Sequence, residues 1–143
     1  MDHQDDDNAI VRQSFGRCTL TDQFLVTFYE ILTGSSDEIR ILFAHTDMPR
    51  QRKLLKEGLI YLISYPTGNE FARTRVTELG ISHSRTRLNV RQEFYQNWID
   101  SLMNAIQRHD SSYSSDLDAA WRRVLAPGIA AMMALYDQPP AVA

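Results

Sequence analysis

The stretch EFARTRVTELGISH, residues 70–83, is the most informative part of this chain. Val76 and Leu79 stand seven and four residues before His83, so all three share one face of a predicted helix. The polar residues 84–87 then end the apolar pattern. A histidine at the buried end of a helix can turn a neutral imidazole nitrogen inward, where it would bind a transition metal. The alternative is a hydrogen-bonded histidine of the core or of the helix end.

Composition predicts one ordinary globular domain. The chain has 143 residues, of which 43% are hydrophobic and 23% charged, enough for a single core. A net charge of −3 excludes the strongly basic surface that nucleic-acid binding needs, so we expect no nucleic-acid partner. We interpret the basic residues of one predicted helix as a solvated face: Arg50, Arg52, Lys53 and Lys56.

Cysteine content and hydropathy bound the class of protein further. Cys18 is the single cysteine, which excludes an internal disulfide, a CxxC metal site and covalent haem attachment through CxxCH. No apolar run approaches the ~20 residues that span a bilayer. Residues 1–7 are acidic where a signal peptide would be basic, so we expect a cytoplasmic protein without a membrane segment. Residues 1–8 and 138–143 are predicted to be frayed ends.

Helical periodicity extends along almost the whole chain, and strand-like alternation is nearly absent. The pattern predicts an all-α domain of seven or eight helices, two of them short. A kink is expected at Pro127-Gly128, because proline removes an internal hydrogen bond of the last helix. The predicted helices cover residues 8–18, 20–34, 35–43, 46–65, 70–83, 90–109 and 115–136.

Several helix starts carry capping residues. Ser35 followed by Glu38 has the pattern of a capping box. Asp47, with a proline in the first turn, predicts a second start. Ser115 with Asp118 predicts the start of the last helix.

From about residue 10 to residue 136 the chain resembles a globin, specifically the bacterial single-domain and flavohaemoglobin-like type. The resemblance rests on an ordered set of residues whose spacing matches the helices of that family. It implies the globin fold: seven to eight helices around a pocket for haem b, which is bound without a covalent link. The set comprises Phe28-Tyr29, Phe43, Gln51 with Leu55, Leu79 with His83, Tyr95 with Trp98, and Ala120-Trp121.

The resemblance assigns a role to each candidate site residue. His83 would be the proximal ligand of the haem iron, with its other ring nitrogen donating to a carbonyl such as that of Leu79. Tyr29 and Gln51 would donate hydrogen bonds to a ligand on the distal side, and Leu55 would keep water away. The alternatives without a ligand role are that Tyr29 is a core tyrosine and that Gln51 is a solvent-exposed glutamine.

The same resemblance predicts which residues hold the cofactor. Arg85 and Arg87 would pair with haem propionates, although solvated surface arginines are an equal alternative. His45 is expected to be an exposed loop residue near the haem edge. The expected cofactor contacts are Phe43, Leu79, Arg85, Arg87, Leu88, Val90, Phe94, Tyr95 and Trp98.

Two departures from the family pattern stand out. The loop between His83 and Val90 is about two residues longer than the usual globin spacing. Tyr136 stands where flavohaemoglobins carry a glutamate late in the last helix. We therefore do not expect the carboxylate–tyrosine–histidine network that makes their proximal imidazole strongly electron-donating.

The resemblance implies binding of O₂, NO and CO at ferrous iron. Nitric oxide dioxygenase activity is one hypothesis, and it needs a separate reductase because no flavin or NAD domain is present in these 143 residues. The alternative is a helical gas-sensing or protein-interaction module that acts as a homodimer through the helix of residues 121–136.

Overall fold

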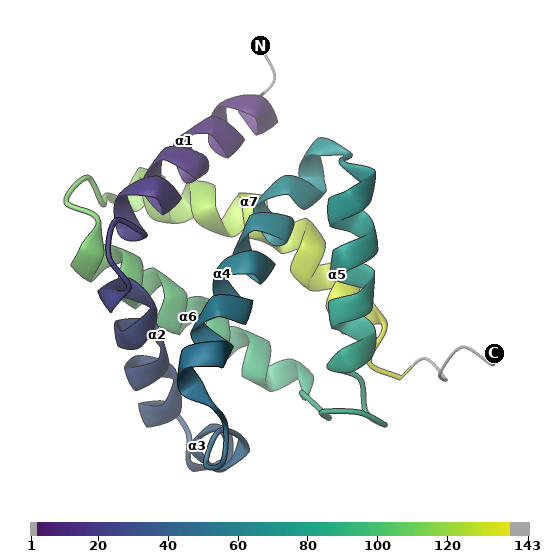
Figure 1. Cartoon of the computed structure of the whole chain (residues 1–143). Helices are drawn as coiled ribbons and strands as arrows, with labels where there is room; N and C mark the ends of the chain where they lie inside the picture. The colour runs from purple at the N-terminus through teal and green to yellow at the C-terminus, as the bar shows by residue number, and fades with distance from the viewer. Residues whose placement is uncertain (1–2, 138–143) are drawn as a thin grey trace.

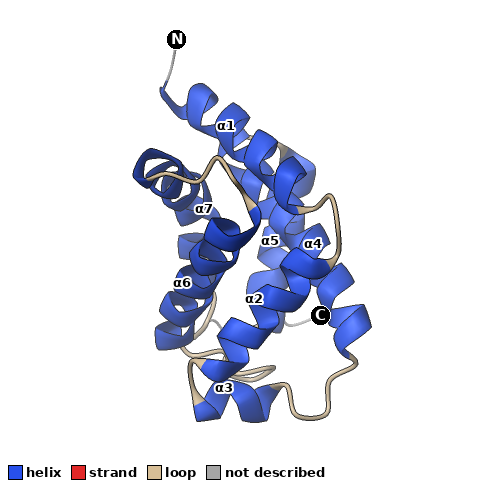
Figure 2. Ribbon diagram, turned by 90° about the vertical axis from the view of Figure 1, so that its left-hand side faces the viewer, coloured by secondary structure: helices blue, strands red, loops and turns tan. Residues whose placement is uncertain are grey.

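A computed structural model describes residues 3–137, and over that range the chain is all-helical, as the sequence predicts (Figures 1 and 2). Seven α-helices and one short 3-10 helix follow one another without a strand in the described range. They are α1 (His3–Cys18), α2 (Gln23–Gly34), α3 (Asp37–Leu42), α4 (Met48–Ser64), η1 (Tyr65–Thr67), α5 (Glu70–Ser82), α6 (Gln92–His109) and α7 (Ser115–Ala134).

The helices pack as crossing pairs around a shared core. α2 packs on α6, α1 and α5 both pack on α7, and α4 lies beside α5 (Figure 1). The completely buried side chains come from six of the helices, so the core is continuous between the pairs. No helix within residues 3–137 is both long and apolar enough to cross a bilayer. The largest of the buried apolar side chains are Trp121, Phe24, Phe28, Leu59, Leu102 and Ile106.

The first helix begins earlier than predicted, at His3 instead of residue 8. Tertiary contacts explain the difference, because they hold this end of α1 against two other helices. Arg123 of α7 donates to the Asp7 carboxylate at 2.8 Å, and the buried Asn8 amide donates to the Ile63 carbonyl at 2.7 Å. Of the frayed ends predicted at residues 1–8 and 138–143, residues 1–2 and 138–143 lie outside the described residues.

The predicted caps are partly correct. Asp47 caps α4 by accepting from the Arg50 N–H at 3.2 Å. The caps of α3 and α7 are instead Ser36 and Ser114, each next to the serine predicted. Adjacent serines are chemically equivalent, so only the extended backbone of the cap residue distinguishes them. Similarly, α6 begins at Gln92, which leaves Val90 in the preceding loop.

Two glycines allow α7 to approach its neighbours closely. A Cβ on Gly128 would lie 2.7 Å from Leu62 Cδ2 of α4. A Cβ on Gly80 of α5 would lie 2.7 Å from Leu135 Cδ1 and 3.1 Å from the backbone Cα of Met132. These contacts bring α5 close to α7 one turn before His83 and so set the position of that histidine.

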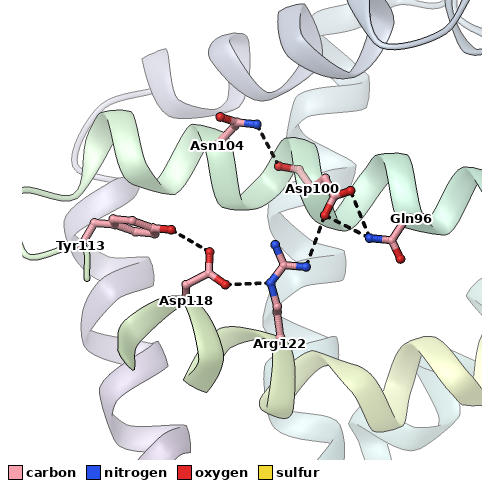
Figure 3. Close-up of polar contacts among 6 residues, drawn as sticks. All are labelled: Gln96, Asp100, Asn104, Tyr113, Asp118 and Arg122. Carbon is pink, nitrogen blue, oxygen red and sulfur yellow. Dashed lines mark hydrogen bonds and ion pairs between the residues drawn. The ribbon is translucent and has the colours of Figure 1, made fainter. Parts of the chain in front are cut away.

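A polar network ties α7 to α6 on the surface (Figure 3). Arg122 of α7 bonds Asp118 on its own helix at 2.7 Å and reaches Asp100 of α6 at 3.3 Å. Tyr113 donates to Asp118, and Gln96 donates to Asp100. Most of these groups are solvent-exposed, so the network contributes little to stability and mainly fixes how α7 lies on α6.

Candidate functional site

A cavity of about 650 Å³ lies between the helices and is lined mostly by apolar side chains. Its size is in the range of small-molecule and cofactor sites. α2, α3, α4, α5, α6 and α7 all contribute to its wall. Of the residues that the sequence predicts for the site, the cavity brings together Tyr29, Phe43, Gln51, Leu55, Leu79, His83, Leu88, Val90, Phe94, Tyr95 and Trp98.

His83 is held at the end of α5 in a defined orientation. Its backbone N–H and its ring Nδ1 both donate to the Leu79 carbonyl, at 3.0 and 2.7 Å. The Ser82 hydroxyl lies 3.0 Å from the same Nδ1. Because a carbonyl accepts and never donates, Nδ1 carries the hydrogen and Nε2 carries the lone pair. Burial lowers the pKa of His83, so the imidazole is neutral near pH 7, and its Nε2 has no hydrogen-bond partner among the described residues.

Tyr29 of α2 and Gln51 of α4 form a polar pair in the same cavity. The Gln51 amide donates to the Tyr29 hydroxyl at 3.1 Å, which leaves the hydroxyl hydrogen free for another acceptor. Burial raises the pKa of Tyr29 to about 12, so this hydroxyl stays protonated. The Phe28 and Phe43 rings contact Tyr29 edge-on, with centroids at 4.9 and 5.5 Å.

The cavity opening is bordered by exposed leucines that the sequence analysis largely missed. Leu42, Leu54 and Leu88 all line the cavity, and they are 46%, 48% and 60% exposed. They come from α3, α4 and the loop after α5, so no single helix pattern could group them. Such a cluster of exposed apolar side chains around an opening indicates a surface that an apolar ligand would cover.

The cationic residues at the site differ from those predicted. Arg85 donates to Asp137 at 2.7 Å and stacks on the Tyr136 ring, and neither Arg85 nor Arg87 lines the cavity. Arg75 of α5 lines it instead. A signal for Arg75 was present, because it precedes Leu79 by one helical turn and so shares its face. His45 is exposed, as expected, and lies outside the lining.

The available donor atoms limit the kind of metal group that the cavity could hold. Residues 3–137 contain no group of three or more histidine, cysteine or acidic side chains that could hold a bare metal ion. His83 therefore offers one ligand and cannot complete a coordination shell with its neighbours. The site suits a large apolar cofactor that supplies the remaining metal ligands itself.

Comparison with solved structures gives a match over nearly the whole chain. A protein of Pseudomonas aeruginosa PAO1, described as structurally highly homologous to a human haemoglobin, is 38% identical with a TM-score of 0.87. The match covers 91% of this chain and 98% of the other. The chain belongs to the globin family. No protein-family model and no curated protein matched this globin.

The loop after His83 of this globin is anchored to the C-terminal segment. The buried Tyr136 hydroxyl donates to the Asn89 side chain, and the Tyr136 carbonyl accepts from the Arg85 N–H at 3.0 Å. Asn89 adopts a left-handed backbone with φ 54°, which asparagine tolerates better than most residues. The next residue, Val90, donates to the His83 carbonyl at 2.9 Å.

These contacts show what Tyr136 does at the position where flavohaemoglobins carry a glutamate. Its hydroxyl is used to hold the loop, whereas the described partners of His83 Nδ1 are a carbonyl and a hydroxyl. Neither partner carries a charge. The imidazole of this globin is therefore a weaker electron donor than one that donates to a carboxylate.

Proposed function

We propose that this globin binds haem b in the 650 Å³ cavity through His83 and uses it to bind O₂, NO and CO. The observation that carries the proposal is the neutral Nε2 of His83, held by the Leu79 carbonyl in the apolar cavity that also contains Tyr29 and Gln51. When bound, haem would supply a ferrous iron that takes diatomic ligands.

The surrounding residues fit that cofactor. Leu55, Phe94 and Trp98 would cover its apolar faces and exclude water. Arg75 lies in the lining and already pairs with Glu78 at 2.9 Å, so it could accept a cofactor carboxylate as a second partner. The exposed leucines of the opening would be covered at the same time.

The polar pair favours retention of the ligand over its rapid release. A bound ligand with partial negative charge would accept from the Tyr29 hydroxyl, while Gln51 orients that hydroxyl. One charge-assisted hydrogen bond contributes roughly 1.5–3 kcal/mol, or about ten- to a hundredfold in release rate. Ligand storage or consumption is therefore better supported than fast oxygen delivery.

Oxidation of NO to nitrate is our second candidate function, after ligand binding. Dioxygen and NO combine to nitrate when one electron is supplied, and the ferrous cofactor would provide that electron. A separate reductase would have to restore it. The uncharged partners of His83 favour reversible ligand binding as the primary role.

A haem titration tests the proposal. Wild-type protein should acquire a sharp Soret band that shifts on reduction and on addition of CO. His83→Ala should lower haem affinity by more than the about 10- to 100-fold that outer partners of a metal ligand contribute. His45→Ala, which changes an exposed histidine outside the cavity, is the matched control and should behave as wild type. A protein that stays colourless with added haem would contradict the proposal.

A further inference from the structure

A second, smaller cavity of about 340 Å³ lies next to the first. Tyr29 and Phe43 line both cavities, so their rings form the wall that the two share. The other uncharged residues of its lining are Val26 and Thr33 of α2, Ala44 after α3, and Met48 of α4. Ligands that entered the smaller cavity would thus stand directly behind the polar pair of the larger one.

One of the two arginines that line the smaller cavity has no ion-pair partner among the described residues. Arg40, Arg52 and Glu30 contribute to the lining. Arg40 pairs with Asp37 at 3.4 Å, and both side chains are mostly exposed. Arg52 is half-buried and forms no ion pair with any described carboxylate, Glu30 included. A partly desolvated guanidinium without a partner favours an anionic ligand.

The wall between the cavities consists of the Tyr29 and Phe43 rings, of which Phe43 is the less buried. Phe43 is half-buried and follows the six-residue helix α3, whereas Tyr29 is buried within α2. The two rings meet edge-on at 5.5 Å with no hydrogen bond between them. Rotation of Phe43 would therefore connect the cavities without breaking the bond between Gln51 and Tyr29.

We propose that the smaller cavity admits small monovalent anions, such as nitrite or azide, to the Tyr29–Gln51 side of the larger cavity. Arg52 attracts them and the Phe43 ring acts as the door. The Arg52 side chain thus has a binding role, unlike the other basic residues at the start of α4. Two experiments test this proposal. The kinetic experiment depends on the proposed haem site, whereas the crystallographic experiment does not.

The kinetic experiment uses the ferric, haem-loaded protein and azide or nitrite as probes, followed by stopped-flow absorption. Arg52→Gln keeps a polar, though shorter, side chain and removes its charge, so anion association should slow about three- to tenfold. Its dependence on ionic strength should also weaken. CO rebinding to the ferrous protein should be unchanged, because CO is neutral.

The matched control is Arg50→Gln, which removes an exposed charge from the same helix outside both cavities. If Arg50→Gln and Arg52→Gln slowed anion association equally, the proposal would be overturned. It would also be overturned if Arg52→Gln slowed CO rebinding as much as anion association. Ala44→Trp, which fills the smaller cavity alone, should slow azide at least as strongly as Arg52→Gln. Unchanged azide association in a folded Ala44→Trp protein would show that anions use the other opening.

The crystallographic experiment needs no cofactor. Crystals soaked in bromide should show an anomalous peak within hydrogen-bond distance of the Arg52 guanidinium, and the peak should vanish in Arg52→Gln. Bromide found on exposed lysines and arginines but not at Arg52 would overturn the proposal. A protein that binds bromide at Arg52 but takes up no haem would contradict the proposed function alone.

Discussion

At the scale of single residues, the site depends on hydrogen bonds that leave one functional atom free. The Leu79 carbonyl holds Nδ1 of His83 and leaves Nε2 available. The Gln51 amide donates to the oxygen of Tyr29 and leaves the hydroxyl hydrogen available. In both cases burial keeps the side chain uncharged near pH 7, because it lowers the pKa of His83 and raises that of Tyr29 to about 12.

Tyr29→Phe tests the role of that hydrogen. The ring and its contacts with Phe28 and Phe43 remain, so haem should still bind. Loss of one charge-assisted hydrogen bond should speed oxygen dissociation about ten- to a hundredfold, measured by stopped-flow displacement with CO. Tyr113→Phe, on the surface network of Figure 3, is the control. An unchanged rate in Tyr29→Phe would mean that the hydroxyl does not meet the ligand.

At the scale of helices, close packing of α5 on α7 places the candidate ligand. Gly80 lies against the backbone of Met132, and His83 follows at the end of the same helix. α7 presents Trp121, Val124 and Leu125 to the core, where they are at most 3% exposed. These side chains therefore pack within the chain and hold α7 in the core.

Gly80→Ala tests the closeness of α5 and α7. The added Cβ would lie 3.1 Å from the Met132 Cα, and a backbone atom cannot move aside as a side chain can. The free energy of unfolding should fall by about 1–3 kcal/mol, measured by urea denaturation. Gly16→Ala adds the same atom to α1, where nothing lies within 4 Å, and should stabilise by about 0.5–1 kcal/mol. Equal effects of the two substitutions would contradict this account.

At the scale of the whole molecule, a buried carboxylate joins three parts of the chain. Asp110, 2% exposed after α6, accepts from Ser14 at 2.6 Å and from Arg17 of α1 at 2.7 and 2.9 Å. Trp121 of α7 donates to Ser14 at 2.9 Å. Burial alone would raise the pKa of Asp110, but the hydrogen bonds from Arg17, Ser14 and the Ser112 N–H together lower it.

This carboxylate makes stability depend on pH in a defined direction. A lowered pKa in the folded state means that the unfolded chain binds the proton more readily. The stabilisation is therefore complete above about pH 4, near the unfolded pKa, and is lost as the pH falls below it. Asp110→Asn should lower the free energy of unfolding by about 1.5–3 kcal/mol near pH 7. The difference in the free energy of unfolding between wild type and Asp110→Asn should narrow below pH ~4, measured by denaturation at a series of pH values. A difference that stays constant with pH would contradict this role of Asp110.

Local pattern predicted the helices, because helical periodicity depends on residues a few positions apart. The period of the apolar residues placed Leu79 and His83 on one face, and the globin resemblance grouped them with Tyr29 and Gln51. Contacts between distant segments were not predictable in this way. Asp110 is 93 residues from Arg17, and nothing in the sequence indicates that they meet.

The sequence by itself thus determined an all-α chain with a histidine at the buried end of a helix, since helical periodicity is a local property. The tertiary structure alone decided that Arg75 instead of Arg85 reaches the cavity, and that Tyr136 holds the loop after His83. A long polar side chain can point several ways from the same backbone. Its direction is selected by partners that folding brings near, such as Asp137 for Arg85.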